Sequence, residues 1–159
     1  MSNSLIVRKP DIRDLNAIVH LNRVSLPENY PVGYFIELIR QWHEVSVVAE
    51  LDGEVVGYVI LRLERERSFP FKFDKSDKGH VISVAVLPKM RRLGIGRKMM
   101  IEVMKAVRLD PNIKSITLEV RMSNEAAVKM YENLEFLKSE MLKNYYADGE
   151  SAYLMKLNL

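Results

Sequence analysis

Apolar positions along the chain follow two spacings, one typical of helices and one typical of strands. Helical spacing begins after Asp11, which can cap a helix, and returns in a second segment where apolar residues from Tyr34 to Trp42 share one face. Pro27 and Pro31 separate the two segments, because proline interrupts a helix. The pattern therefore predicts two short helices before residue 43.

Two later segments also have helical spacing, and seven runs have the composition of strands. The first of these helices carries an apolar stripe over 95–107, and the second begins at Ser123 or Asn124. Asp52-Gly53 and Asp148-Gly149 each predict a hairpin between neighbouring strands. The predicted strands are 5–9, 45–51, 54–63, 79–86, 113–120, 136–146 and 151–157.

The elements follow one another in the order β-α-α-β-β-β-α-β-α-β-β. This order favours the α/β class, with a mixed central sheet and helices on its faces. With 159 residues and no repeat or linker, the chain is predicted to be one domain over 1–159. The charged stretch 64–78, which contains Phe69, Phe71 and Phe73, is interpreted as a solvated hairpin loop, with a lid or a partner contact as the alternative.

Composition narrows the classes of function. The chain has no cysteine, which excludes disulfides and thiolate metal sites, and His20 and His43 lack partners at ligand spacing, so we expect no metal. A net charge of +3 suits an anionic small ligand but is too small to indicate nucleic-acid binding. No apolar run is long enough to span a membrane, and the first 20 residues lack the core of a signal peptide. We therefore expect a cytoplasmic protein.

Candidate chemistry centres on 79–98, where a strand, a cationic turn, two glycines and a helix follow one another. Backbone N–H groups at a helix start lack intrahelical partners and carry partial positive charge, so they attract anions. Gly94 and Gly96 let a phosphate approach the backbone closely, because glycine has no Cβ. We predict a site for a phosphorylated ligand. No Walker A loop matches, and Met99 stands where a dinucleotide-binding loop has its third glycine.

Residues 91–96 instead fit the pattern [RQ]-x-x-G-x-[GA], the acyl-CoA loop of the GCN5-related N-acetyltransferase (GNAT) superfamily, which the chain also resembles in its order of elements. The resemblance implies acetyl-CoA as cofactor, with the pantetheine arm along a splayed strand at 84–86. It implies further contacts from Asn124 and Tyr131 on the next helix. The cofactor residues implied by the resemblance are Val84, Ala85, Val86, Arg91, Arg92, Leu93, Gly94, Ile95, Gly96, Arg97, Asn124 and Tyr131.

Four blocks, at 26–30, 79–86, 118–127 and 145–153, are similar to the catalytic subunits of NatA-type N-terminal acetyltransferases, particularly their stand-alone archaeal forms. The resemblance implies transfer of acetyl to the α-amine of N-termini that begin with Ser, Ala or Thr, with Met-Leu and acidic starts left open. The residues that it places around the peptide are Leu26, Glu28, Tyr30, Tyr145 and Tyr146.

An N-terminal amine is chemically suited to direct attack on a thioester, which needs a neutral nucleophile. At pH 7 about one tenth of an α-amine with a pKa near 8 is neutral, whereas the neutral fraction of a lysine side chain is below about one thousandth. Glu28 and His80 are the candidate bases, acting directly or through water, and Glu119 is a third candidate that can hold either His80 or the water in place. Tyr131 is the candidate to return a proton to the thiolate, with solvent as the alternative. A backbone N–H near Val84 is expected to stabilise charge on the thioester oxygen.

Two other functions stay open at this point. One keeps the fold but changes the acceptor to that of a RimI-like enzyme, a lysine or a small amine; the other is a non-catalytic acyl-CoA sensor. We expect a monomer that acts on protein or peptide N-termini and binds neither nucleic acid nor membrane. Proximity to the ribosome and an auxiliary subunit are left open.

Overall fold

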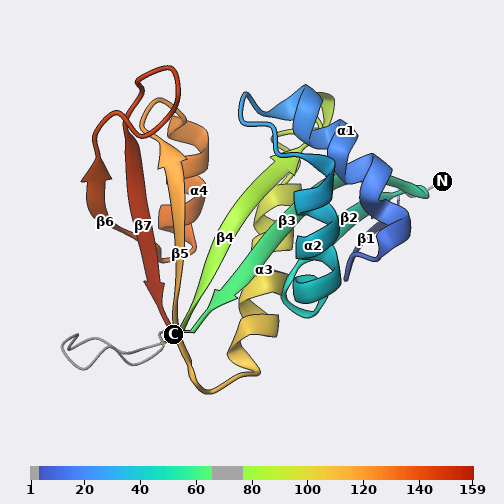
Figure 1. The fold of residues 1–159 in the computed structure, drawn as a ribbon, viewed down its shortest axis with the longest axis horizontal. Helices are drawn as coiled ribbons and strands as arrows, with labels where there is room; N and C mark the ends of the chain where they lie inside the picture. The colour runs from blue at the N-terminus through green and yellow to red at the C-terminus, as the bar shows by residue number, and fades with distance from the viewer. Residues whose placement is uncertain (1–3, 66–76) are drawn as a thin grey trace. The chain divides into compact units, whose positions relative to one another are not determined.

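The computed structural model describes residues 4–65 and 77–159, and within them the chain forms seven strands and four α-helices in the predicted order (Figure 1). The strands are β1 (Leu5–Arg8), β2 (Val47–Leu51), β3 (Glu54–Glu64), β4 (Asp77–Val86), β5 (Ile113–Arg121), β6 (Leu137–Leu142) and β7 (Ala152–Asn158). The α-helices are α1 (Leu15–Ser25), α2 (Val32–Trp42), α3 (Ile95–Arg108) and α4 (Glu125–Asn133). Short 3₁₀ turns lie at Ile12–Asp14, His43–Val45 and Pro88–Met90.

The strands form one mixed sheet in the order β1-β2-β3-β4-β5-β7-β6. β4 and β5 are parallel, and their register runs from Asp77 to His80 on β4. The pairs β1–β2, β2–β3, β5–β7 and β6–β7 are antiparallel. The predicted mixed α/β sheet is therefore confirmed.

The described residues group into two compact units. The first comprises 4–62 and 82–109, and the second comprises 63–65, 77–81 and 110–159. The boundary passes through β3 and β4, so each of these strands belongs to one unit at one end and to the other unit at the other end. A single domain over 1–159 stays a prediction.

In the first unit, α1 and α2 lie on one face of the sheet and α3 on the other (Figure 1). The core under α1 and α2 is built from fully buried side chains, including Phe35, Ile18 and Tyr58. On the opposite face, the predicted apolar stripe of α3 is buried from Ile95 to Val107. α3 comes so close to β3 at Gly57 that a Cβ there would lie 2.9 Å from Met99 Cε. A glycine on β3 thus allows the close approach of this helix.

The first predicted hairpin is confirmed. Asp52 and Gly53 have φ values of 50° and 84°, the left-handed conformations that a two-residue turn between antiparallel strands requires. In the second unit, by contrast, the predicted strand 136–146 ends at Leu142, and residues 143–151 form a loop. Asn144 has a φ of 49°, which turns the backbone out of the strand. The hairpin predicted around Asp148-Gly149 is present, since β6 and β7 pair antiparallel as far as Leu142 and Ala152, but its loop is longer than predicted.

The stretch 64–78, predicted as a loop, overlaps a strand at each of its ends. Glu64 still belongs to β3, and Asp77 and Lys78 already belong to β4. Residues 66–76, with Phe69, Pro70, Phe71 and Phe73, lie outside the described residues, so the proposed lid or partner contact is not tested. Over 4–65 and 77–159, none of the helices is long and apolar enough to cross a membrane.

Candidate active site

The turn between β4 and α3 has the backbone of an anion-binding loop. Arg92 and Gly94 adopt positive φ values of 67° and 79°, and α3 begins directly after Gly94. The first helical hydrogen bond runs from Lys98 N to Gly94 O, so the N–H groups of the preceding turn are not used by the helix itself. A Cβ built on Gly94 would meet nothing within 4 Å. A helix start that follows such a turn fits an anion such as a pyrophosphate group.

Arg91, which precedes this turn, bonds to the protein's own backbone. Its Nε donates to Val86 O at 3.3 Å and its Nη2 donates to Ser25 O at 3.1 Å. It thereby ties the end of β4 to the end of α1. On β4, Ala85 is buried, whereas Val84 and Val86 are half-buried. The cofactor contacts predicted for these residues stay predictions.

The loop 26–30 carries three of the residues predicted around the peptide. Leu26 and Tyr30 pack against the core under α1 and α2, and Glu28 is half-buried. The Tyr30 ring lies 5.3 Å from Tyr34 and 5.9 Å from Phe35, centroid to centroid, and its hydroxyl donates to Ile82 O at 3.4 Å. Tyr30 is thus held between α2 and β4.

In the second unit, His80 lies between two carboxylates. Its Nε2 is 2.8 Å from Glu119 Oε2, on β5, and its Nδ1 is 2.6 Å from Glu64 Oε1, at the end of β3. Lys78 Nζ lies 3.7 Å from the other oxygen of Glu64. The predicted contact of His80 with Glu119 is present. Sequence reasoning missed Glu64, because it assigned this residue to a loop; only the register of β3 beside β4 would have pointed to it.

The carboxylates determine the charge of His80. Burial by itself would lower the pKa of the imidazole, but the hydrogen bonds and charge of Glu119, and then of Glu64, outweigh it and raise the pKa above its usual 6.5. With an acceptor at each nitrogen, the doubly protonated ring satisfies both contacts by donating twice. The two carboxylate contacts thus favour the imidazolium form of His80, which cannot accept a further proton.

We expect NMR titration of the His80 ring to give a midpoint above 6.5, and Glu64→Gln to lower it. The stability that this imidazolium contributes is fully present below pH 6.5 and is lost as the pH rises through the raised pKa, because the folded state then releases its extra proton. Glu125→Gln, a change of the same kind on the exposed start of α4, is the control and should leave the midpoint unchanged. A wild-type midpoint at or below 6.5 would contradict the assignment.

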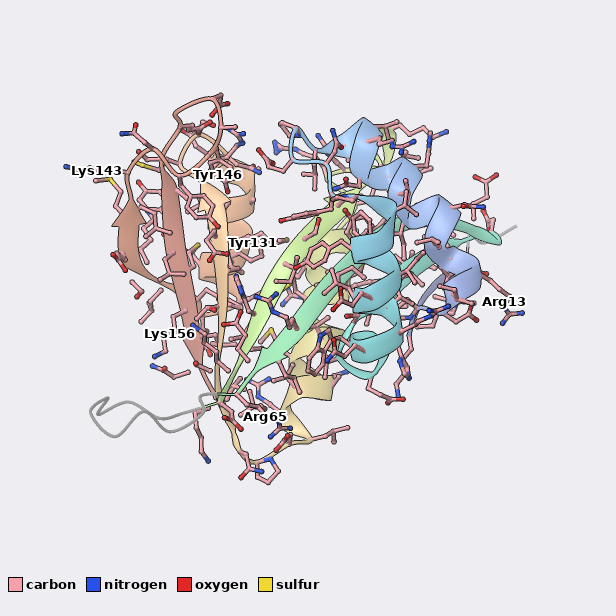
Figure 2. The ribbon with its side chains drawn as sticks, viewed as in Figure 1. Arg13, Arg65, Tyr131, Lys143, Tyr146 and Lys156 are labelled. Atoms are coloured by element: carbon pink, nitrogen blue, oxygen red, sulfur yellow. The ribbon has the colours of Figure 1, made fainter. Side chains whose placement is uncertain are left out.

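α4 carries the two remaining residues predicted to contact the cofactor. Asn124 is its N-cap, as predicted, and its side-chain oxygen accepts from Ala127 N at 3.2 Å. Tyr131, labelled in Figure 2, is buried and packs 5.8 Å from the ring of Phe136. Burial raises the pKa of Tyr131 to about 12, so its hydroxyl stays protonated and can only donate or share its proton at neutral pH.

The loop 143–151 presents Tyr145 and Tyr146, whose rings meet edge to face at 5.0 Å. Arg121, on β5, holds this loop: its Nη1 lies 2.8 Å from both Asp148 Oδ2 and Glu150 Oε2, and its guanidinium carbon lies 4.1 Å from the centroid of the Tyr146 ring. Glu150 also accepts from Ser123 N at 2.9 Å. Hydrogen bonds from Ser123, and then from Arg121, lower the pKa of Glu150 to about 2.

These contacts explain why the strand 136–146 ends early. Arg121, Asp148 and Glu150 compensate for the ladder bonds that the loop gives up. Arg121 was not singled out from the sequence, although it lies inside the block 118–127 that carries the resemblance. Its spacing to the acidic pair is 27 and 29 residues, which no local pattern reveals.

Comparison with known proteins agrees with this geometry. The model of the acetyltransferase (GNAT) family matches residues 15–136. The chain is 42% identical to an N-alpha-acetyltransferase of Sulfurisphaera tokodaii, over 94% of this chain and 90% of that protein. It is 36% identical to the N-terminal acetyltransferase A complex catalytic subunit NAA10 of Arabidopsis thaliana, over 96% and 77% respectively.

A solved structure shows the same fold. Ard1 from Thermoplasma volcanium superimposes with a TM-score of 0.83 at 28% identity, over 98% of this chain and 97% of that one. The predicted fold, activity and use of acetyl-CoA are thereby confirmed. The chain belongs to the GNAT acetyltransferase family, as an N-terminal α-amine acetyltransferase that uses acetyl-CoA.

Proposed function

We propose that the chain acetylates N-termini whose first residue is Ser, Ala or Thr, with Glu28 as the base that removes the proton from the attacking amine. The observation that carries the choice of base is the pair of carboxylates around His80, at 2.6 and 2.8 Å. An imidazolium held in this way has no lone pair left for the amine. Glu28 is a half-buried carboxylate on the loop 26–30, and a carboxylate is one of the groups that can act as a general base.

Acetyl-CoA supplies a thioester, from which the acetyl group passes to the amine nitrogen as the carbon–sulfur bond breaks. On the protein side, the amides of residues 92–97 bind the pyrophosphate, and the side-chain nitrogen of Asn124 donates a hydrogen bond to the cofactor. The backbone of Val84 and Val86 pairs with the pantetheine arm. The open space beside Gly94 supports this assignment, because no other atom lies within 4 Å of a Cβ position there.

Within this mechanism, His80 and Glu119 form a positioning pair, and Tyr131 stabilises the leaving sulfur. A hydroxyl with a pKa of about 12 holds its proton more tightly than a thiol, whose pKa is near 8.5. Complete proton transfer from Tyr131 to the thiolate is therefore uphill. Tyr131 donates a hydrogen bond to the sulfur, and solvent supplies the proton.

We assign Tyr145 and Tyr146 of the second unit to contacts with the peptide, as we do Leu26 and Tyr30 of the first unit. Arg121 holds the loop that carries Tyr145 and Tyr146, so its loss should disturb the peptide and not the cofactor. We expect Arg121→Met to raise the KM for the peptide by about tenfold, equivalent to ~1.4 kcal/mol, because it leaves Asp148 and Glu150 without their cation.

Steady-state kinetics with each substrate varied in turn measures this effect. Lys129→Met, which removes a charge from an exposed site on α4, is the matched control and should leave both KM values unchanged. An equal rise in the KM for acetyl-CoA in Arg121→Met would contradict the assignment of the loop to the peptide.

The acceptor preference is tested by competition among peptides that differ only at the start: Ser-, Ala-, Thr-, Glu- and Met-Leu-. We expect kcat/KM for the three small starts to exceed the others by about 10- to 100-fold, because a pocket walled by aromatic rings discriminates by size at roughly 1–3 kcal/mol. Equal rates for all five would overturn the preference but not the activity.

The proposal includes action as a monomer in the cytoplasm, as expected from the sequence.

A further inference from the structure

Asn22 is a buried polar residue among the buried apolar side chains of α1. It lies on α1, one turn before the helix ends at Ser25, and only 1% of its surface is exposed. An amide side chain at such a depth costs free energy unless its donors and acceptor are used. Its partners therefore indicate why the residue is an asparagine.

The partners lie on both sides of the same short loop. Asn22 Nδ2 donates to Glu28 O at 3.0 Å, and Asn22 Oδ1 accepts from Tyr30 N at 3.2 Å. The Asn22 side chain thus forms hydrogen bonds with the backbone of the residue before Asn29 and of the residue after it. The placement of the two amide atoms follows from this pairing, since the N–H₂ faces a carbonyl and the oxygen faces an N–H.

The amide is anchored in turn to the sheet. Asn22 Nδ2 also donates to Tyr58 Oη at 3.2 Å, and Tyr58 Oη lies 2.9 Å from Ser83 Oγ. Tyr58 is fully buried on β3, and Ser83 is 6% exposed on β4, next to Val84. A continuous buried chain of hydrogen bonds therefore connects the Glu28 loop with the strand that leads to the cofactor loop.

We propose that Asn22 is a positioning residue for Glu28, acting through Tyr58 and Ser83 to hold the loop 26–30 in a fixed place relative to β4. The inference rests on the proposed function, in which Glu28 is the base. The acetyl group is expected at Val84, one residue beyond the anchor. Attaching both the Glu28 loop and β4 to the same network fixes the position of the base relative to the acetyl carbonyl carbon. A displacement of about 1 Å in such a site costs up to about 100-fold in rate.

The network has features that a plain core contact does not need. A leucine at position 22 would fill similar volume, but it would leave the Glu28 carbonyl and the Tyr30 N–H inside the protein without these bonds. Both bonds are made to the main chain of the loop and not to the Glu28 side chain. Asn22 therefore acts on catalysis through Glu28 and is not itself a catalytic residue.

The test is a double-mutant cycle between Asn22→Ala and Glu28→Gln, with kcat measured on a Ser-start peptide. At pH 7 we expect Asn22→Ala alone to lower kcat by about 10- to 100-fold. In the Glu28→Gln background the same change should lower kcat by less than about threefold, because the group that it positions is already disabled. The affinity for acetyl-CoA, from calorimetry, should change by less than about twofold in each protein.

The pH profile separates positioning from general damage. Above a pH of about 8 the amine is mostly neutral and needs no base, so the defect of Asn22→Ala should shrink as the pH rises. Ser46→Ala is the matched control: Ser46 is also 1% exposed in the first unit and bonds to Leu61 O and N, away from the loop. It should lower stability and leave kcat and its pH profile unchanged.

Tyr58→Phe provides a second variant that preserves packing if Asn22→Ala does not fold. It removes the hydroxyl between Asn22 and Ser83, and we expect a loss in kcat of about threefold that disappears in the Glu28→Gln background. Losses of equal size in both backgrounds, or a defect that does not vary with pH, would overturn the inference while leaving Glu28 as the base. An unchanged kcat in Glu28→Gln would overturn the proposed base itself and, with it, the inference.

Discussion

Glu28→Gln is expected to lower kcat for peptide acetylation at pH 7 by about 10²- to 10⁴-fold, the range over which a positioned general base contributes. The amide keeps the shape of the side chain but cannot accept the proton of the amine. Binding of acetyl-CoA should survive, because the change does not touch the loop 91–97, to which we assign the cofactor. Rapid-quench or steady-state measurement of kcat, with calorimetry for the cofactor, checks both statements.

The pH dependence gives this prediction a second test. The defect of Glu28→Gln should diminish above a pH of about 8, where free amine is abundant. Glu37→Gln, on the exposed side of α2, makes the same change of charge in the same unit and should retain full kcat. Retention of kcat by Glu28→Gln together with a large loss in His80→Gln would reverse the roles given to Glu28 and His80.

Phe35→Ala is expected to lower the free energy of unfolding by about 3–5 kcal/mol, the usual cost of truncating a buried phenylalanine. Phe35 has no exposed surface, and its ring meets both Tyr30 at 5.9 Å and Tyr58 at 6.1 Å, centroid to centroid. The cavity would thus open beside the loop 26–30 as well as beneath α2. A loss of this size is a large part of the stability of an ordinary domain.

Urea denaturation followed by tryptophan fluorescence measures the change, since Trp42 lies at the end of the same helix. Val32→Ala at the exposed start of α2 is the control and should change the free energy by less than about 0.5 kcal/mol. A cost below 1.5 kcal/mol for Phe35→Ala would show that α2 is not packed as described.

Local patterns were sufficient for most of the fold. The periodic stripe over 95–107, the cap at Asn124 and the Asp52-Gly53 turn each depend on residues within a few positions of one another, and each is present. The loop 143–151 was mispredicted because the residue that stabilises it, Arg121, comes from a distant strand. The apolar composition of 136–146 gives no sign of that partner.

The site was predictable only where a motif or a resemblance covered it. The glycine loop and the blocks around Glu28, His80 and Tyr145 were found in this way. Glu64 and Asn22 were not found. Glu64 contacts His80, which is 16 residues away, and Asn22 bonds to Tyr58, which is 36 residues away, and the sequence does not state which distant residues lie side by side. A carboxylate at the end of a strand and an asparagine on an apolar helix face look ordinary until their partners are known.

The central claim, that acetyl is transferred to N-terminal α-amines, is tested most directly by mass spectrometry of one reaction. The purified chain and acetyl-CoA are mixed with Ser-, Ala-, Glu- and Met-Leu-start peptides and with an N-terminally blocked peptide that contains an internal lysine. We predict acetyl groups on the free α-amines, with Ser and Ala starts modified first, and none on the blocked peptide. Acetylation confined to the lysine of the blocked peptide would contradict the account.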